Sequence, residues 1–480
     1  MISLRTIRRL CVAALAAAAA VPAIVTTAQA RAARYVPGEV VVGYTQGPLP
    51  TVVRDAATRM GVRAIAAAAP GGSGATAGAQ VMRLPRGVSV AQAIASLRRQ
   101  PGVAYVVPNF IAHADGEWIP DDRGRTNFAG GWEQLQWNFL GAAGVNAPEA
   151  WANLIADHRP GGRGVTVAIL DTGVAYRSWH QFRKSPDFSE TRFIDPCDLV
   201  AGSISRGRCT DPYALDREGH GTFVAGTVAE TTNNRLGLTG LAYGATLMPV
   251  RVLDADGTGD AATIAAGIRY AATHGAQVIN LSLEFDLAVT SADIPDIISA
   301  IRFAHRRGVI VVGASGNDST EQVAYPARVP DVIAVGATTR DRCLALYSDG
   351  GPGLALVAPG GGDDSNALND PNCHPNRNLP NIYQMTLVNP SNPGVFGLPG
   401  DWFGTSMAAP HASATAALVI ASGVLGRHPT PDQVLMRLEQ TAQPLGGSKP
   451  NQNYGYGLID AGAATVPIGS AARHSPRRRP

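Results

Sequence analysis

A serine is set among small residues in the stretch Gly404-Thr405-Ser406-Met407-Ala408-Ala409-Pro410. The residues that follow, 411–422, are nearly all Ala, Ser, Thr or Val, so they predict a helix that can pass through a crowded core. We place Pro410 within the first turn or so of this helix, where a missing backbone N–H costs little. Ser406 is therefore a candidate nucleophile, although a serine at a helix start is also an ordinary N-cap.

A reactive serine needs a base and an orienting acid, and two other segments offer them. The apolar run 165–170 predicts a buried parallel strand that ends at Asp171. His220 lies between two glycines at the expected start of another helix. Taken singly, such an aspartate is usually a turn residue and such a histidine a structural one. Taken together with Ser406, they favour nucleophilic catalysis.

These three segments resemble the motifs of the subtilisin-like serine peptidases, which carry Asp, His and Ser in this chain order. The resemblance covers roughly Trp132 to Ala464 and includes the closing segment 455–460. It implies a triad in which Ser406 attacks a peptide carbonyl, His220 acts as the base and Asp171 orients the imidazole. The implied reaction is peptide hydrolysis through an acyl-enzyme.

The same resemblance assigns further residues of the site. Asn317, in Ala314-Ser315-Gly316-Asn317, is the implied oxyanion donor, although Gly-Asn is also an ordinary turn pair. Two segments match those that flank an extended substrate in the family: Gly257, Thr258 and Gly259, and Leu281, Ser282 and Leu283. Where the family usually has glycine next, this chain has Glu284. Its carboxylate either favours basic substrate side chains or faces solvent or a local basic partner.

A structural calcium ion is a further expectation from the resemblance. The segment 233–238 resembles a family loop that binds calcium, with Asn234, Leu236 and Leu238 as candidate ligands through amide and carbonyl oxygens. The aspartate that usually completes that site is not found, because His180-Gln181-Phe182 stands where His-Pro-Asp would be expected. No cofactor is expected for catalysis itself.

The first 30 residues predict a secretory signal peptide. Three arginines precede an apolar stretch, 10–25, and Ala28-Gln29-Ala30 supplies small residues for cleavage. A membrane anchor is the alternative, but Arg31 and Arg34 follow promptly and no second apolar segment of spanning length occurs. We therefore expect a secreted, extracellular protein with no membrane attachment after the signal is removed.

Export makes disulfides plausible for the cysteines that remain, since Cys11 is discarded with the signal. They are Cys197, Cys209, Cys343 and Cys373. Four cysteines allow three pairings, and the local ones, 197 with 209 and 343 with 373, need the least rearrangement of a large α/β fold. Buried free thiols or another connectivity are the alternatives. Metal ligation is disfavoured because no Cys-x-x-Cys spacing occurs.

Residues 31–114 read as a small α+β module. Strands are expected over 39–44, 80–84 and 103–107, helices over 51–60 and 90–100, and a flexible Ala/Gly-rich connection over 64–79. By itself the module could be any interaction domain. However, the run 105–114 resembles the end of the inhibitory propeptide of the family, which the enzyme cuts away itself. We expect that cut between Ala114 and Trp132, in an accessible linker, 115–131.

Residues 132–465 are the expected peptidase domain, followed by a basic tail, 466–480. Strands are predicted near 165–170, 246–253, 277–283, 309–313 and 332–337, and helices near 220–230, 261–274, 294–306, 406–422 and 431–441. This alternation predicts an α/β fold with a mostly parallel sheet and helices on both faces, of the subtilisin-like kind.

Composition limits the partners of the chain. The 480 residues carry a net charge of +3 from 40 basic and 37 acidic side chains, which gives no signature of nucleic-acid binding. We expect a monomer that acts on proteins and peptides and is inhibited by its own propeptide. A dedicated processing peptidase of narrow specificity and a catalytically silent binding protein of the same fold are the alternatives.

Overall fold

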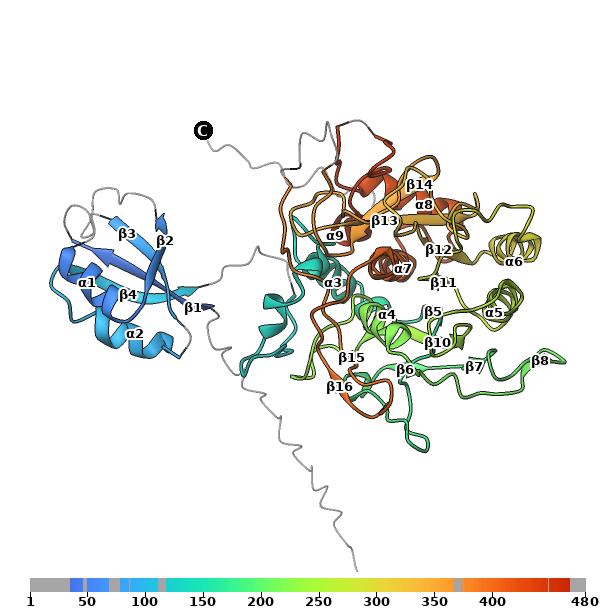
Figure 1. The fold of residues 1–480 in the computed structure, drawn as a ribbon, viewed down its shortest axis with the longest axis horizontal. Coiled ribbons are helices and arrows are strands. Elements are labelled where there is room, and N and C mark those ends of the chain that lie inside the picture. The colour runs from blue at the N-terminus through green and yellow to red at the C-terminus, as the bar shows by residue number, and fades with distance from the viewer. Residues whose placement is uncertain are drawn as a thin grey trace, which may run out of the picture. The chain divides into compact units, whose positions relative to one another are not determined.

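A computed structural model of the chain describes residues 35–45, 50–68, 78–85, 87–110, 118–366, 373, 375–447 and 449–466. The predicted signal peptide, Ala114, residues 115–117 and almost all of the basic tail lie outside the described residues. Contacts divide the chain into two units, Met1–Ala112 and His113–Pro480, and each is described by itself (Figure 1).

The first unit contains a four-stranded antiparallel sheet in the order β2-β3-β1-β4. Its elements are β1 (Tyr35–Tyr44), α1 (Thr51–Arg59), β2 (Arg63–Ala68), β3 (Gly78–Arg83), α2 (Val90–Leu97) and β4 (Val103–Phe110). Val40, Val53, Leu97 and Val106 are buried between the sheet and the helices. The sequence placed part of β2 in a flexible connection. That prediction was wrong, because backbone pairing with β3 orders this alanine-rich segment.

The second unit is built on an eight-stranded sheet in the order β14-β13-β12-β11-β5-β10-β6, with β7 also paired to β10, and its neighbouring strands run parallel. Its strands are β5 (Thr166–Asp171), β6 (Arg192–Phe193), β7 (Cys197–Asp198), β8 (Ile204–Ser205), β9 (Arg208–Cys209), β10 (Thr246–Arg251), β11 (Val278–Leu281), β12 (Ile310–Ala314), β13 (Val332–Thr338), β14 (Leu354–Pro359), β15 (Thr386–Leu387) and β16 (Phe396–Gly397). Its helices are α3 (Ala147–Ala156), α4 (His220–Ala229), α5 (Ala261–Thr273), α6 (Pro295–Arg306), α7 (Thr405–Ser422), α8 (Pro431–Thr441) and α9 (Ala461–Thr465).

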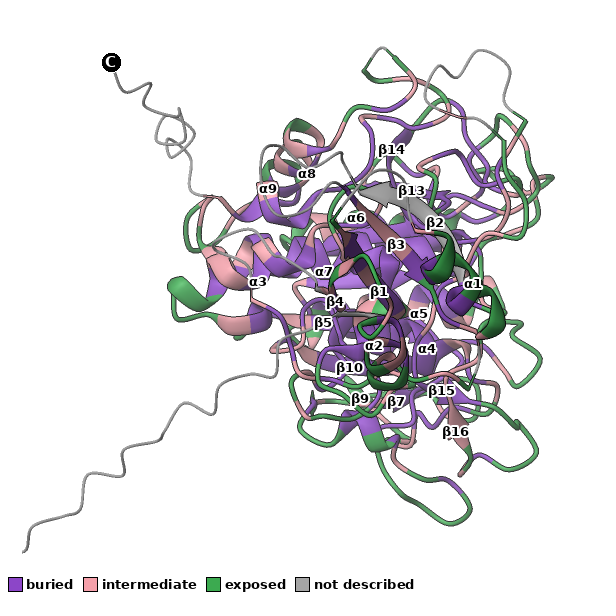
Figure 2. Cartoon of the chain, turned by 90° about the vertical axis from the view of Figure 1, so that its left-hand side faces the viewer, coloured by how far each residue is buried: buried purple, intermediate pink, exposed green. Residues whose placement is uncertain are grey.

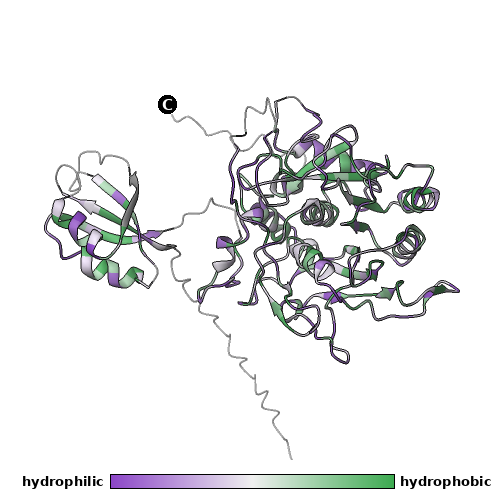
Figure 3. Ribbon diagram, viewed as in Figure 1, coloured by the Kyte–Doolittle hydropathy of each residue, from purple (hydrophilic) through white to green (hydrophobic). Residues whose placement is uncertain are grey.

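Helices cover both faces of this sheet, which confirms the predicted fold. α4 and α7 pack on one face, and α5 and α6 on the other (Figure 1). The strands are accordingly apolar on both sides (Figure 3): in β5, Val167 and Ile169 join the core under α4 and α7, while Ala168 and Leu170 join the core under α5 and α6. Figure 2 shows α7 almost entirely buried, as its small residues predict. None of the helices in the described ranges is both long and apolar enough to cross a bilayer.

The topology fixes where a site can form. β5 lies between β10 and β11, so the chain first adds a strand on one side of β5 and then crosses to its other side. Such a reversal opens a crevice at the carboxyl ends of the strands. Asp171 is the last residue of β5, so it lies at this point.

The segment from Trp118 onward packs against the second unit. The indole of Trp118 lies 5.7 Å from that of Trp151 and 5.4 Å from the Tyr243 ring, measured between centroids. Asp122 is fully buried. The sequence predicted an accessible linker over 115–131. This expectation is wrong for residues 118–122, which indole and carboxylate contacts hold in place, whereas Arg123, Arg125 and residues 127–129 are exposed.

Two disulfides link neighbouring segments of the second unit, and they are the local pairs that the sequence predicted. Cys197 pairs with Cys209 across Cα atoms 5.6 Å apart, and Cys343 pairs with Cys373 across 5.1 Å. The first connects β7 to β9, so it anchors the β8–β9 hairpin to the edge of the sheet.

Candidate active site

A buried carboxylate meets an imidazole at the end of β5. Asp171 is fully buried, and its Oδ1 lies 2.7 Å from His220 Nδ1 while accepting a second hydrogen bond from the backbone N–H of Thr172. Because an ionised carboxylate can only accept, Nδ1 carries a proton, so in the neutral ring the free lone pair is on Nε2. The arrangement holds His220 in the tautomer that a general base requires.

Glycine allows the strand end and the helix start to approach this closely. His220 is the first residue of α4, and Gly221 follows it. A Cβ on Gly221 would overlap the carbonyl oxygen of Gly173 and lie 3.1 Å from the Asp171 Cβ. Any larger residue at 221 would push His220 away from its carboxylate partner.

Asp216 organises the loop that leads into α4. Its carboxylate accepts hydrogen bonds from the Thr172 hydroxyl at 2.9 Å, from the N–H groups of Glu218 and Gly219, and from both the N–H and the hydroxyl of Thr222. This one side chain ties the end of β5 to the first turn of α4. Sequence reasoning missed it, and its position just before the Gly-His-Gly segment was the available signal.

Ser406 is the second residue of α7, and its hydroxyl donates to the carbonyl of Ser282 at 3.3 Å. The Ser282 hydroxyl in turn donates to the Ser406 carbonyl at 2.8 Å. In a regular helix that carbonyl would accept from residue 410, but Pro410 has no N–H. Pro410 therefore lies in the second turn rather than the first, and the Ser282 hydroxyl takes the place of its missing donor.

One cleft of about 340 Å³ brings most of the predicted residues together. Its lining residues are Thr172, Glu218, His220, Leu253, Gly257, Thr258, Gly259, Ile264, Ser282, Leu283, Glu284, Phe285 and Ser406. Leu281 does not line it, because this residue is buried inside β11. Asp171 reaches the cleft only through its contact with His220.

Asn317 joins the site through the first residue of α7. Its Oδ1 accepts hydrogen bonds from the backbone N–H of Thr405 at 2.9 Å and from the Thr405 hydroxyl at 3.1 Å. Its Nδ2 donates to Glu284 Oε1 at 3.2 Å. The amide is therefore held immediately beside the residue that precedes Ser406.

Comparison with protein families gives a match for most of this unit. Residues 162–457 match the description "Subtilase family", which is more than half of the chain. The chain belongs to the subtilase family. Residues 22–109 match a second description, "Fervidolysin N-terminal prodomain", so the subtilase domain follows a prodomain.

Individual relatives agree with this family. Subtilisin BL of Lederbergia lenta is 35% identical over 329 residues, which cover 68% of this chain and 97% of the relative. Subtilisin E of Bacillus subtilis strain 168 is 33% identical over 381 residues, which cover 78% of each chain. Among solved structures, a protease of Pseudoalteromonas arctica PAMC 21717 gives a TM-score of 0.56 at 29% identity, over 72% of this chain and 99% of that one. This subtilase is a serine-type endopeptidase, a hydrolase that needs no catalytic cofactor.

Acidic neighbours set the protonation of the subtilase histidine. Burial alone lowers the pKa of His220, but the charge and hydrogen bond of Asp171, followed by the charges of Glu218 and Asp216, raise it more, to about 8. Burial also raises the pKa of Glu218, whose Oε2 accepts a hydrogen bond from the backbone N–H of His220 at 2.6 Å. Since a general base must be unprotonated, we expect kcat/KM to rise with pH through about 8.

Replacing Glu218 with glutamine tests this electrostatic setting. The glutamine amide oxygen can still accept the hydrogen bond from the backbone N–H of His220, but glutamine lacks the negative charge that stabilises the protonated imidazole ring. We expect Glu218→Gln to move the acid limb of the kcat/KM profile to lower pH, by about 0.3–1 unit. Asp157→Asn, an exposed change after α3, should leave the limb in place. A limb that moves to higher pH would contradict this account.

Three acidic side chains surround the loop 233–238 that resembled a calcium site. Asp187 accepts hydrogen bonds from Asn234 Nδ2 and from the N–H of Leu238, both at 2.9 Å. Asp122 accepts from the N–H groups of Asn233 and Asn234. Glu230 lies nearby, and its Oε1 is buried without a hydrogen-bond partner. Burial raises the pKa of Asp122 to about 7, that of Asp187 to about 8 and that of Glu230 in the same direction.

The sequence expectation that this site lacks its aspartate is therefore wrong. His180-Gln181-Phe182 does not supply one, but Asp187, a few residues further along, reaches the loop. Asp122 was also missed, because it comes from a segment far from the loop in the chain, and Glu230 was missed although it comes just before the loop, because nothing local indicated that its carboxylate is buried. The only sequence signal was Ser185-Pro186-Asp187, a displaced version of the expected pattern.

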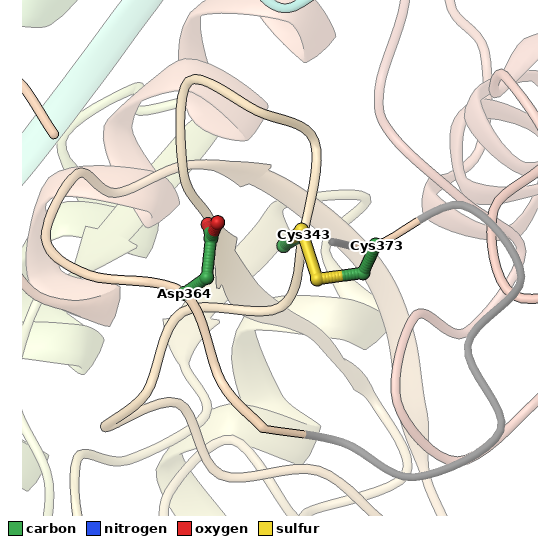
Figure 4. A group of neighbouring side chains, drawn as sticks. All are labelled: Cys343, Asp364 and Cys373. Carbon is green, nitrogen blue, oxygen red and sulfur yellow. A yellow bond between two sulfur atoms is a disulfide. The ribbon is translucent and has the colours of Figure 1, made fainter. Parts of the chain in front are cut away.

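A second group of potential ligands does not make a metal site. Cys343, Cys373 and Asp364 lie within 4.8 Å of one another by their ligand atoms (Figure 4). Both sulfur atoms are joined in the disulfide, so neither is a thiolate. Asp364 accepts hydrogen bonds from the Thr339 hydroxyl and, at 2.8 Å, from the N–H of Asn376. Its role is to hold the disulfide loop together.

Proposed function

We propose that this subtilase is an exported endopeptidase in which Asp171, His220 and Ser406 act as the catalytic triad. The observation that carries the proposal is the 2.7 Å contact between Asp171 Oδ1 and His220 Nδ1, at the edge of a cleft that Ser406 also lines. Hydrolysis proceeds through an acyl-enzyme, as the three roles require.

The steps follow from the positions of these groups. On substrate binding the Ser406 hydroxyl leaves the Ser282 carbonyl and turns to His220 Nε2, which takes its proton as the oxygen attacks the scissile carbonyl. His220 then gives that proton to the departing amine, and the peptide C–N bond breaks. A water molecule repeats the sequence against the ester, releasing the acid and restoring Ser406. Asp171 stays ionised and stabilises the imidazolium in both halves.

The negative oxygen of the tetrahedral intermediate is stabilised by Asn317 Nδ2 and by the backbone N–H of Ser406. That N–H donates to no described backbone carbonyl, as expected in the first turn of a helix, where the helix dipole also favours negative charge. Losing one such donor lowers turnover about a hundred- to thousandfold in a subtilisin, and we carry that figure over from the family.

The first unit is proposed to be the inhibitory propeptide, cut away by the enzyme itself after the signal peptide has directed export. Trp118 and the residues that directly follow it are held in the second unit, so we place the cut on the N-terminal side of residue 118. After processing, the enzyme is proposed to act outside the cell as a monomer on extended peptide segments aligned along 257–259 and 282–284.

Reaction with a serine-directed fluorophosphonate tests the central proposal against a silent binding protein of the same fold. An active site should be labelled at Ser406, and peptide mapping would identify the modified residue. Labelling elsewhere, or none in the processed protein, would contradict the triad. Profiling the cleaved bonds in a peptide library then separates a broad endopeptidase from a dedicated processing enzyme, which would cut few sequences.

We also propose a structural calcium ion at the loop 233–238, held by Asp187 and by oxygens of Asn234, Leu236 and Leu238. The donors are all oxygen, as calcium prefers, and the carbonyls of Leu236 and Leu238 accept no backbone hydrogen bond from a described residue. The three acidic side chains do not all converge within 4.8 Å, so Asp122 and Glu230 are assigned the role of neighbouring charge. The ion would stabilise the loop and take no part in catalysis.

Removal of this ion should destabilise the folded enzyme. With calcium at about a thousand times its Kd, binding contributes about 4 kcal/mol, so chelation should lower the Tm of this large unit by roughly 4–8 °C. Calorimetry of the Ser406→Ala protein, which cannot digest itself, would measure the shift. In Asp187→Asn the shift on chelation should be much smaller. An unchanged Tm on chelation would rule the site out.

A further inference from the structure

The amide of Asn317 is fixed at both ends. Thr405 occupies its oxygen with two donors, so Nδ2 must point the other way, toward Glu284 Oε1 at 3.2 Å. An amide nitrogen carries two hydrogens, and this contact uses one. The second has no acceptor within the described residues. Asn317 does not itself line the cleft, but its hydrogen-bond partner Glu284 does, and its other partner, Thr405, directly precedes Ser406, which also lines it.

Glu284 is an unusual neighbour for such a donor. Its second oxygen faces Gly316: a Cβ there would lie 2.9 Å from Glu284 Oε2 and would overlap Asp349 Oδ2. Two carboxylates thus meet across a residue that has no side chain. Asp349 is fully buried, and its Oδ2 has no hydrogen-bond partner.

No cation from the described part of the chain compensates these groups. Neither Glu284, Asp318 nor Asp349 takes part in an ion pair within the described ranges. Burial, together with the charges of Asp349 and Asp318, raises the pKa of Glu284, while its hydrogen bond with Asn317 lowers it. Across the cleft the charged groups are His220 and Glu218.

We propose that Glu284 is a positioning residue for Asn317: by accepting one hydrogen of Nδ2 it directs the other toward the oxygen of the scissile carbonyl. This inference rests on the proposed role of Asn317 as oxyanion donor. An oxygen of the Glu284 carboxyl group can accept the hydrogen bond from Asn317 whether or not the group is protonated, so positioning does not depend on pH. The charge of Glu284 does depend on pH, and the ionised form repels the oxyanion that forms beside it.

A positioning role for Glu284 fits these contacts better than selection of a basic substrate side chain does. Glu284 lines the cleft, but each of its oxygens has a neighbour within the protein: Oε1 accepts from the Asn317 amide, and Oε2 lies beside the backbone of Gly316. In addition, the sequence before residue 118, Ile-Ala-His-Ala-Asp-Gly-Glu over 111–117, has no Lys or Arg. An enzyme that cut itself there would not do so after a strongly basic residue.

Two substitutions separate positioning from charge. Glu284→Ala removes the acceptor, and we expect kcat to fall about tenfold with little change in KM, since a misdirected donor affects the transition state alone. Glu284→Gln keeps an acceptor without the charge. It should restore most of the lost kcat and exceed the wild type at pH values where His220 is neutral and Glu284 is ionised. Glu439→Ala, remote on α8, is the matched control.

A double-mutant cycle completes the test. In an Asn317→Ala background, Glu284→Ala should cause no further loss of kcat, because nothing is left to position; where Glu284 is ionised, loss of its charge should instead raise kcat slightly. Additive losses, or a Glu284→Ala enzyme with wild-type kcat, would overturn the proposal. So would an effect confined to the KM of Lys or Arg substrates, which would assign Glu284 to side-chain selection.

Fluorophosphonate titration of each variant counts competent sites, so a misfolded fraction is not mistaken for lower kcat. If the wild type itself reacts with neither probe nor substrate, the proposed function fails. If the wild type is active and the Glu284 variants match it, only the positioning role fails.

Discussion

Ser406→Ala is expected to leave the precursor at full length apart from loss of the signal peptide, while the wild type is recovered in a shortened form. Without the hydroxyl there is no nucleophile for either the propeptide bond or an external substrate. Turnover of a peptide substrate by separately processed protein should fall about a millionfold, a figure carried over from the subtilisins. Intact-mass measurement of both precursors would also locate the processed bond.

A control on the same helix tests whether the effect is specific. Ser422→Ala removes a hydroxyl near the end of α7 that donates to the Val419 carbonyl and accepts from the Val424 N–H, far along the helix from Ser406, so processing should continue. A shortened Ser406→Ala precursor, produced in cells that lack other extracellular peptidases, would show that another group cuts the chain. Retention of the Trp118 segment in the mature protein would support the placement of the cut.

Asp171→Asn is expected to lower kcat about ten-thousandfold while the protein stays folded, again by analogy with known triads. The asparagine can keep the hydrogen bond from Thr172, but it removes the charge that stabilises protonated His220. Because that charge is the largest influence raising the His220 pKa, the acid limb of the rate profile should also move well below pH 8.

Both readouts are needed for Asp171→Asn. Circular dichroism and fluorophosphonate titration would establish that the variant is folded and how many sites remain competent. A loss of activity with the acid limb still near pH 8 would mean that another carboxylate controls His220. Since Glu218 and Asp216 also face it, Glu218→Gln provides the comparison within the same loop.

The sequence was sufficient for features that depend on local pattern. The buried strand ending at Asp171, the glycine-flanked His220 and the helix of small residues after Ser406 all follow from adjacent residues, and the parallel sheet follows from their alternation. β2 was missed because an alanine-rich segment with Ile65 as its single β-branched residue shows no alternation, and only its pairing with β3 makes it a strand.

Features assembled from distant segments could not be predicted in this way. The carboxylates of Asp122, Asp187 and Glu230 come from three parts of the chain, and no local spacing relates them. The contact between Glu284 and Asn317 likewise depends on how the loop after β11 meets the loop after β12. Sequence indicated that Glu284 departs from the family, but its partner emerged only from the fold.

Ser282 and Ser406 each donate their hydroxyl to the backbone carbonyl of the other, and this has a consequence for the enzyme when no peptide is bound. The reactive oxygen is tethered at 3.3 Å to a backbone carbonyl, a weak contact that costs little to break. That carbonyl belongs to the segment along which an incoming chain is proposed to align. An arriving polypeptide that bonds this carbonyl would displace the hydroxyl from it and so favour the free serine oxygen in the substrate complex, which suits a protein that carries its first target on its own chain.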